Sequence, residues 1–332
     1  MRKLILTIAA TLIAASTTQA ADPVKIRIGW VAMPSELQPV LFAKQGIAQH
    51  NGKSYVMEAI HYKGTPLMVT AMATGDLEIA PLAFSAFATS ILNAGMTDLR
   101  IIADEFQDGV GDYHTNLFLV RKDSPIKRVE DLKGKVVASN AAGSAVDLAI
   151  RAMLKKHGLE APRDYTIVEA GFPNLKDMLL EKKVDLIPSL PPFVFDPDLL
   201  AKSRVLFTRK DAVGLTETII WCARSEFLQK NRAAMMDFME DALRAVRWYI
   251  DPANHDEVVK ILATEMKMPP ERLADWVFTK KDLYRDPNML PNLGALQSSI
   301  DLMHDLGFLK STLDVKQYDD LSFVREAATR VK

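Results

Sequence analysis

The pattern of apolar and polar positions predicts an α/β protein in which short strands alternate with amphipathic helices. Residues 25–30 alternate, with Ile26 and Ile28 on one face, which is typical of a strand with one buried side. Similar apolar runs recur along the chain, separated by turn residues. The strands expected from these runs are 25–30, 55–60, 76–80, 99–103, 116–121, 135–138, 165–169, 184–190, 205–208 and 218–223.

Helical periodicity appears between these strands and dominates the last third of the chain. Thr65 and Pro66 are expected to open one helix and Gly75 to end it, because proline suits the first helical turn and glycine the position after the last. The helices expected are 35–46, 65–74, a short alanine-rich helix after Ser85, 145–157, 174–183, 225–249, 256–266, 270–278 and 292–306.

A weak internal repeat suggests two similar halves. Residues 75–82, GDLEIAPL, follow one predicted helix, and residues 183–190, KVDLIPSL, follow another, and both end in a proline-containing loop with a phenylalanine just beyond. Two α/β lobes that present strand-end loops to a shared cleft would produce this repeat. In open α/β sheets such strand ends are where ligands bind.

The segment 135–158 carries the clearest candidate for ligand binding. An apolar strand, 135–138, leads into the small-residue turn 139–144 and then into an amphipathic helix, with Ser144 and Asp147 in an S-x-x-D start pattern. Such a turn leaves backbone N–H groups unpaired beside the positive end of the helix dipole, which favours a small anion. The alternative, an ordinary strand–helix connection, stays open on this segment alone.

Residues 1–20 match a signal peptide, with Arg2 and Lys3 before an apolar stretch and cleavage expected near Ala20/Ala21. The mature chain is therefore expected in a periplasm. Lys and Arg number 41 and Asp and Glu 42, so losing two basic residues changes the net charge from 41 − 42 = −1 to 39 − 42 = −3. This balance argues against nucleic acid as a partner. The single cysteine, Cys222, lies in an apolar run and is expected to be buried.

The sequence holds no familiar catalytic or metal-binding motif. H-E-x-x-H, C-x-x-C, the P-loop, G-x-S-x-G and G-x-G-x-x-G are all missing, and the six histidines have no spacing typical of a metal site. No nucleophile, base and orienting group come together in the pattern. We therefore expect neither a catalytic residue, nor a metal site, nor a cofactor, and we expect a binding protein rather than an enzyme.

Several ordered segments resemble one protein family. They are 25–30 with its loop, 64–66, 73–80, 121–127, the most diagnostic segment 129–137 (VEDLKGKVV), and 180–185, with Lys183 where the family has glycine. Together they are similar to the periplasmic solute-binding proteins of ABC importers for nitrate, aliphatic sulfonates and taurine, a group that also includes binders of thiamine-pyrimidine precursors.

The resemblance implies the two-lobed periplasmic binding protein fold (type II), an α/β fold with two crossings between lobes and a helical C-terminal segment packed on the first lobe. Lobe 1 is expected from 21–113 and 217–332, and lobe 2 from 114–216. The implied protein is a monomer that closes on a small-molecule anion and docks transiently on an ABC transporter permease.

The family's cleft positions, carried over, give the expected ligand-binding residues. They are Trp30, Ser35, Gly64, Thr65, Ala83, Phe84, Ser85, His114, Asn140, Gly143, Ser144, Ala145, Pro191, Phe193, Thr216 and Glu217. Trp30, Phe84 and Phe193 favour an organic anion, such as a sulfonate, a taurine-like compound or a carboxylate, over nitrate. The turn 139–143 departs from the family, and no arginine near it offers a bidentate clamp.

Two other functions stay open. The family also resembles enzymes on the same fold, a desulfinase and the pyrimidine-forming enzymes of thiamine synthesis, which use a cysteine or a motif rich in His and Cys in the cleft. Cys222 is the only cysteine that could serve here. A sensor that presents its liganded form to a membrane receptor is the third function, and the sequence does not separate it from transport.

Overall fold

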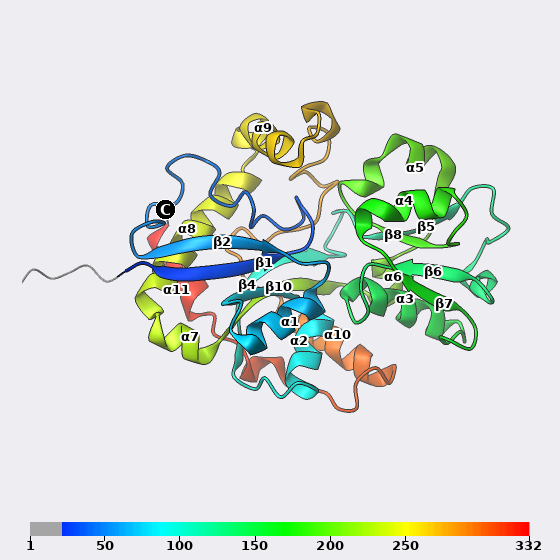
Figure 1. Cartoon of the computed structure of the whole chain (residues 1–332), viewed down its shortest axis with the longest axis horizontal. Helices are drawn as coiled ribbons and strands as arrows, with labels where there is room; N and C mark the ends of the chain where they lie inside the picture. Colours follow the sequence, from blue (N-terminus) through cyan, green and yellow to red (C-terminus); the bar gives the residue numbers. More distant parts are fainter. Residues whose placement is uncertain (1–21, 332) are drawn as a thin grey trace, which may run out of the picture.

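The chain folds around two β-sheets that lie side by side and are joined by two crossings (Figure 1). The computed structural model describes residues 22–331, so the expected signal peptide lies outside the described residues. We call the part built on the five-stranded sheet lobe 1, and the part from β5 to α6 lobe 2. The exact lobe boundaries at 113/114 and 216/217 stay a prediction.

Lobe 1 is a mixed sheet in the order β2-β1-β3-β10-β4. Its strands are β1 (Val24–Trp30), β2 (Tyr55–His61), β3 (Ile79–Ala83), β4 (Leu99–Asp108) and β10 (Thr216–Arg224). β1 runs parallel to β2 and β3, whereas β10 is antiparallel to both β3 and β4. β4 leads out of lobe 1 and β10 returns to it, and these two crossing strands pair with each other in the sheet.

Lobe 2 has the same strand order as lobe 1 but is built from shorter strands. They are β5 (Leu117–Arg121), β6 (Val136–Ser139), β7 (Thr166–Glu169), β8 (Ile187–Ser189) and β9 (Ser203–Thr208). A parallel bridge between Val137 and Leu186 joins the pair β6-β7 to the sheet β8-β5-β9. The resulting order β7-β6-β8-β5-β9 matches that of lobe 1. The repeated segments 75–82 and 183–190 therefore lead into equivalent strands, β3 and β8.

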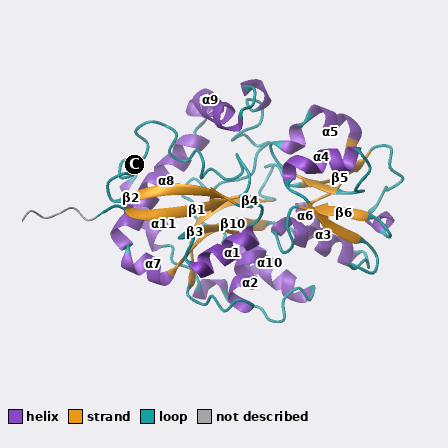
Figure 2. Ribbon diagram, in the orientation of Figure 1, coloured by secondary structure: helices purple, strands orange, loops and turns teal. Residues whose placement is uncertain are grey.

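Helices flank both sheets (Figure 2). They are α1 (Thr65–Thr74), α2 (Phe84–Leu92), α3 (Ala145–Lys156), α4 (Phe172–Leu180), α5 (Pro197–Lys202), α6 (Arg209–Val213), α7 (Ser225–Lys230), α8 (Arg232–Ile250), α9 (His255–Met266), α10 (Leu293–Asp305) and α11 (Ser322–Arg330). After β10 the chain is helical and packs on lobe 1: α8 contacts β2, and α10 contacts β10. This confirms the expected place of the C-terminal segment.

Two expected helices do not form. Residues 35–46 make successive turns, with Val40 N–H donating to the Leu37 carbonyl and Ala43 N–H to that of Val40. Pro39 has no N–H and disfavours helical geometry at the residue before it. Residues 270–278 likewise form only a short 3₁₀ turn (Pro270–Arg272) followed by further turns.

Each lobe has its own apolar core. One cluster fills lobe 1 and includes Trp221, Phe238 and Phe87, all essentially fully buried; the other fills lobe 2 around Phe118 and Leu154. Separate cores allow the lobes to move as units about the crossings. None of the helices described in the structure is long and apolar enough to span a membrane.

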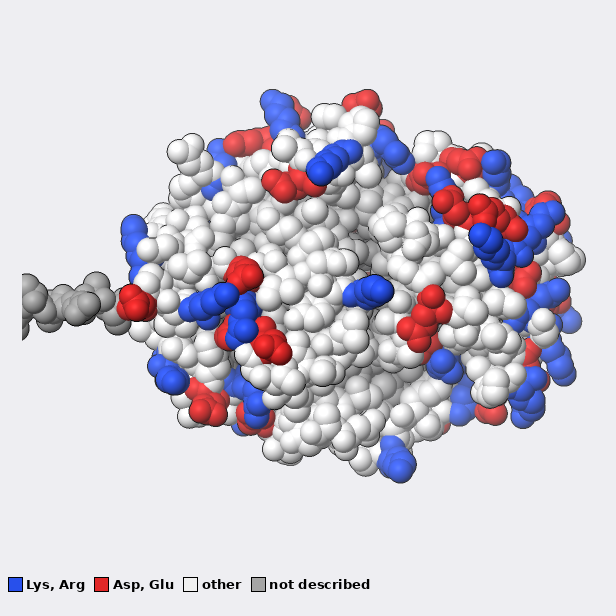
Figure 3. Space-filling model, in the orientation of Figure 1, with Lys and Arg blue, Asp and Glu red and all other residues white. Residues whose placement is uncertain are grey.

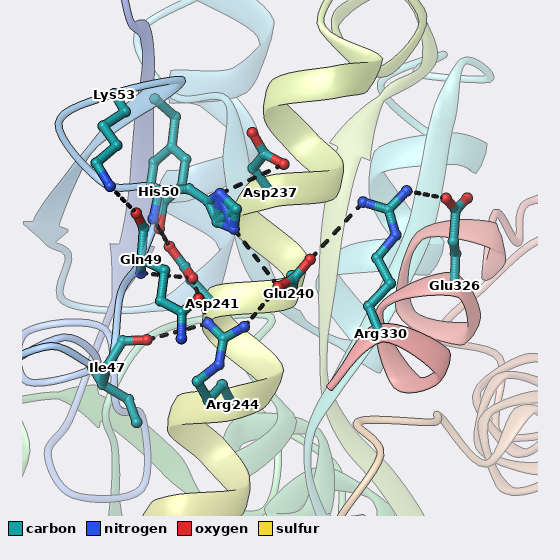
Figure 4. A network of polar contacts seen from close by, with 11 residues as sticks. Ile47, Gln49, His50, Lys53, Asp237, Glu240, Asp241, Arg244, Glu326 and Arg330 are labelled. Carbon is teal, nitrogen blue, oxygen red and sulfur yellow. Dashed lines mark hydrogen bonds and ion pairs between the residues drawn. The ribbon is translucent and has the colours of Figure 1, made fainter. Parts of the chain in front are cut away.

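A buried carboxylate ties α8 to the segment before β2 (Figure 4). Asp241, which is 0% exposed, accepts hydrogen bonds from Gln49 N–H at 2.9 Å, His50 N–H at 2.8 Å and the Tyr55 hydroxyl at 2.8 Å. Arg244 supplies the counter-charge at 2.6 Å. With four donors satisfied in a buried place, this carboxylate fixes the irregular segment onto the helix.

Removing Asp241 is expected to destabilise the protein strongly. Asp241→Ala leaves the Gln49 and His50 N–H groups and the Tyr55 hydroxyl without this acceptor. It also removes one of the two carboxylates that pair with Arg244, the other being Glu240, so the free energy of unfolding should fall by about 3 kcal/mol. Asp237, on the same helix and 27% exposed, is the control: Asp237→Ala should cost less than about 1 kcal/mol. Urea unfolding of both variants checks this, and equal losses would contradict the role assigned to Asp241.

Candidate functional site: a cavity between the lobes

A cavity of ≈ 60 Å³ lies where the two lobes meet. Lobe 1 lines it with Val31, Ala32, Ser35, Glu36, Thr65, Ala83, Phe106, Thr218 and Ile219. Lobe 2 lines it with Asn140, Ser144, Ala145, Val146, Phe172, Leu190 and Arg209, and the first crossing adds Asn116. Many of these follow the carboxyl ends of strands, where ligands of α/β sheets bind. On the face drawn in Figure 3, charged side chains gather over the outer part of lobe 2, and the surface at the junction is mostly uncharged.

Arg209 is the one arginine on the cavity wall. It opens α6 directly after β9, its backbone N–H donates to the Asn116 carbonyl at 2.8 Å, and only 2% of it is exposed. The nearest carboxylate oxygen is Asp108 Oδ2, 3.6 Å from Nε. Among residues 22–331, neither Nε nor Nη1 has a hydrogen-bond partner. A buried guanidinium with free donors is a binding element for a planar or tetrahedral acid group.

Two further polar groups on the wall have unused hydrogen-bonding capacity. Thr65 Oγ1, at the start of α1, and Asn116 Oδ1, in the crossing, are both buried without a partner within the described part of the chain. Buried polar atoms are normally satisfied, so such atoms beside a cavity indicate a place where a ligand or water binds.

The turn before α3 is confirmed as a capped helix start. One of the N–H groups expected to bind an anion, that of Gly143, is already bonded to a carboxylate of the protein, that of Asp147. Ser144 is the N-cap and accepts from Asp147 N–H. The Asp147 carboxylate accepts from Gly143 N–H at 2.9 Å and pairs with Arg151 at 3.0 Å. The first helical residues, Ala145 and Val146, line the cavity. Their N–H groups, which a helix leaves unpaired, stay available to a ligand.

A carboxyl group also faces the cavity. Glu36 is 4% exposed, and one of its oxygens accepts the N–H of Val31. Burial and the neighbouring carboxyl of Glu105 raise the pKa of Glu36 well above its usual range; the N–H groups of Val31 and Ala32 and the charge of Arg285 oppose the shift. The cavity therefore has an acid on its lobe 1 side and a guanidinium on its lobe 2 side.

Six of the expected ligand-binding residues lie on the cavity wall: Ser35, Thr65, Ala83, Asn140, Ser144 and Ala145. They come from both lobes, so the structure brings together segments more than a hundred residues apart. The other ten lie elsewhere in the fold.

Four of these ten make contacts between the lobes. Ser85 Oγ donates to the Gly143 carbonyl at 2.8 Å, and Ser35 Oγ to the Pro191 carbonyl at 3.3 Å. Gly64 faces the turn 140–143 so closely that a Cβ there would lie 2.7 Å from the Ala141 Cβ. These contacts hold the lobes together around the cavity.

The three aromatic side chains expected in the cleft lie off the cavity wall. Trp30 packs on His61, with ring centroids 4.5 Å apart, and Phe84 is 0% exposed in the lobe 1 core. Phe193 stacks on Phe172 at 5.9 Å and lines a second cavity of ≈ 220 Å³ beside the first. Phe172 lines both cavities and is the aromatic residue of lobe 2 that faces the site.

The last three residues belong to the crossings. The His114 ring packs on Phe195 at 5.8 Å, and burial lowers its pKa to about 4, which keeps it neutral at neutral pH. Thr216 shares a hydrogen bond of 2.9 Å with Thr218, whose side chain lines the cavity. Glu217, the second residue of β10, is buried, does not line the cavity, and accepts the Asn292 N–H at 2.5 Å.

Sequence reasoning missed Glu36, Asn116, Phe172 and Arg209. Arg209 follows the apolar strand β9 and precedes Asp211, which forms a capping box with Thr208. Its position directly after a predicted strand, at the sheet edge where ligands bind, was the one indication in the sequence that Arg209 could reach the site. Glu36 was assigned to a helix that does not form, so its direction could not be deduced.

The comparisons with known proteins establish the fold. The structure superposes with a TM-score of 0.69 on the alkanesulfonate-binding protein SsuA from Xanthomonas axonopodis pv. citri bound to MOPS, at 19% identity, over 91% of this chain and 99% of that one. It matches the nitrate-binding protein NrtA from Synechocystis PCC 6803 with the same TM-score, at 15% identity, over 93% and 89%. The chain thus has the two-lobed periplasmic binding protein fold.

The sequence comparisons confirm the resemblance to this group. The NMT1/THI5 like family model matches residues 109–255, which span the first crossing, lobe 2, the return crossing and α8. A relative from Escherichia coli (strain K12), provisionally named as an aliphatic sulfonates-binding protein, is 22% identical over 330 residues, or 96% of each chain. The desulfurization enzyme DszB shares the fold with a TM-score of 0.64, at 14% identity, over 92% of this chain and 99% of that one.

A pair of buried acids on the crossing strands makes stability depend on pH. Asp104 of β4 and Glu217 of β10 interact with each other. The negative charge of Asp286 raises the pKa of both groups, and that of Glu105 also raises the pKa of Asp104. Burial raises the pKa of Asp104 to about 7 and that of Glu217 well above its usual range. The folded protein therefore keeps protons that the unfolded chain releases, and stability falls as pH rises through this window.

We expect the free energy of unfolding to decrease from pH 5 to pH 8, by up to about 1.4 kcal/mol per pH unit for each proton involved. Asp104→Asn removes one titrating group, so its unfolding free energy should fall less steeply than that of the wild type. Asp112→Asn, at an 86% exposed position in the same crossing, should keep the wild-type slope. Urea unfolding at four pH values measures this, and equal slopes for wild type and Asp104→Asn would contradict it.

Proposed function

We propose that the chain is the substrate-binding component of an ABC-type importer that captures a small organic acid between its lobes and delivers it to a membrane permease. The observation that carries the proposal is Arg209, a buried guanidinium with free donors on the wall of the inter-lobe cavity. The named functions of the sulfonate- and nitrate-binding proteins of similar fold support it. The periplasm is the proposed location, in line with these proteins and the expected signal peptide.

The size of the cavity favours a compact acid. Its volume of ≈ 60 Å³ is well below the roughly 150 Å³ of a cavity that accommodates benzene. A sulfonate or carboxylate group with a few carbon atoms suits it in the conformation described, and an aromatic acid would need the lobes to part. Binding across the two lobes would favour the closed form, which is the one a permease is expected to recognise.

An enzymatic role finds no support in the position of the cysteine. Cys222 lies in β10, 0% exposed, away from the cavity wall, and burial raises the pKa of its thiol well above its usual range. A buried neutral thiol is a poor nucleophile. Within residues 22–331, no group of three or more His, Cys, Asp or Glu side chains is placed to hold a metal ion. A sensor would use the same site. The neighbouring genes distinguish the two roles: a permease and an ATPase indicate transport, and a receptor indicates sensing.

Ligand binding should stabilise the protein and depend on Arg209. A bound acid at 100 times its dissociation constant adds about 2.7 kcal/mol to the free energy of unfolding, which thermal unfolding detects with a panel of short sulfonates and carboxylates. Arg209→Gln should weaken binding by about 10- to 100-fold, because it removes charge-assisted hydrogen bonds. Lys210→Gln, at the exposed neighbouring position outside the cavity, should bind normally. Unchanged affinity in Arg209→Gln would refute the proposed site.

Closure of the lobes should depend on the small size of residue 64. A Cβ there would meet Ala141 of lobe 2 at 2.7 Å, while the backbone of Gly64, with φ −176°, suits any residue. Gly64→Ala should therefore leave the stability of the unliganded protein nearly unchanged and reduce ligand affinity by about tenfold or more. Calorimetric titration beside thermal unfolding measures both effects. A variant that binds as tightly as wild type would show that the contact is not needed for binding.

A further inference from the structure

The inter-lobe cavity has an acidic side chain on its wall, although the ligand proposed for it is also an acid. Glu36 of lobe 1 and Arg209 of lobe 2 both line the cavity, and both are at least nine-tenths buried. The cavity volume is only ≈ 60 Å³, so an acid group held by Arg209 also lies close to the Glu36 carboxyl. Two negative charges so close together in a buried place repel each other strongly, because little water screens them.

One guanidinium serves three buried carboxyl groups on this side of the cavity. Arg285 is the cation that acts on Glu36, and it acts on the carboxyls of Glu105 and Asp282 as well. It lies 3.6 Å from Asp282 and donates hydrogen bonds to two backbone carbonyls, at 2.9 and 2.8 Å. Its single positive charge therefore cannot balance three ionised carboxyls together with the negative charge of a bound acid.

The hydrogen bonds indicate which of the three carboxyls carries a proton when the acid is bound. Glu105 accepts from the Trp221 indole and the Gln38 amide, and Asp282 accepts two backbone N–H groups, at 3.0 and 2.8 Å. Burial raises the pKa of all three carboxyls, and the charge of Glu105 raises that of Glu36 further. Glu36 is the member of the three that lines the cavity. A proton on Glu36 therefore relieves the repulsion of the bound acid most directly.

A neutral carboxyl at this place has the chemistry to bind an acid. Its O–H group is a hydrogen-bond donor, and an acid kept neutral by an apolar environment can donate to a negatively charged group. Val31, Phe106 and Ile219 give the lobe 1 wall around Glu36 this apolar character. The same side chain would thus repel the ligand when ionised and bind it when protonated.

We infer that Glu36 is a hydrogen-bond donor of the binding site: its carboxyl group keeps a proton and donates it to an oxygen of the bound acid, opposite the Arg209 guanidinium. This inference rests on the proposed function and adds a specificity-determining residue to its site. Because Glu36 belongs to lobe 1 and Arg209 to lobe 2, hydrogen bonds from both to one acid group tie the lobes together.

Infrared difference spectroscopy with ethanesulfonate tests the protonation of Glu36. This probe has no carbonyl group, so a change on binding in the carbonyl band of a protonated carboxyl comes from the protein. The wild type should show such a change, with the band shifted in D₂O because the proton exchanges, and Glu36→Gln should lack it. Glu217→Gln, at a buried position outside the cavity wall whose carboxyl also has a raised pKa, should keep it. A wild-type spectrum without the change, or the same change in Glu36→Gln, would overturn the inference.

Two substitutions of Glu36 separate hydrogen bonding from packing. Glu36→Gln keeps a donor at the same length, so its affinity for ethanesulfonate in calorimetric titration should stay within about threefold of the wild type. Glu36→Met has a similar length and no donor, so its affinity should fall by about tenfold or more. Equal affinities of the two variants would contradict the donor role. If thermal unfolding shows that Glu36→Met does not fold, the infrared comparison of the wild type with Glu36→Gln still decides.

The two levels of the account fail differently. Binding of ethanesulfonate without an infrared signal from Glu36 would overturn the donor role and leave the acid-binding function standing. Failure of ethanesulfonate and of every other acid in the panel to bind the wild type would overturn the proposed function itself.

Discussion

A guanidinium buried between two lobes is the constraint on which the rest of this structure depends. Removing Arg209 from water is costly unless its charge is matched and its donors are used. Asp108 matches the charge at 3.6 Å, but the protein leaves donors free on the cavity wall. The fold thus places a guanidinium with unused donors on the wall of the inter-lobe cavity, where the proposed acidic ligand would complete its hydrogen bonds.

The crossings and the lobe contacts support this arrangement. β4 and β10 lie side by side and carry the buried acids Asp104 and Glu217, and the same two strands give Phe106, Thr218 and Ile219 to the cavity wall. Contacts such as Ser85 to Gly143 and the close approach of Gly64 to Ala141 bring the lobes together around it. Separate apolar cores allow each lobe to stay intact while the junction changes. Rigid lobes around a polar junction are what ligand-driven closure requires.

The sequence predicted most of the architecture because local patterns determine strands, caps and repeats. The Ser144 cap and the equivalence of β3 and β8 were both deducible from a few adjacent residues. The site was predicted less completely. The neighbours of Glu36 and Arg209 in space come from distant segments, and no local pattern shows that a turn after β1 faces a turn after β9. Phe84 was expected in the cleft but lies in the lobe 1 core. The sequence of a short helix does not show which of its faces neighbouring elements will cover.

A crystal structure of the protein grown with ethanesulfonate tests the central claim most directly. The account predicts the ligand in the inter-lobe cavity, with sulfonate oxygens within about 3 Å of the Arg209 guanidinium and the Thr65 hydroxyl. A ligand bound in another cavity, or one whose sulfonate points away from Arg209, would contradict it.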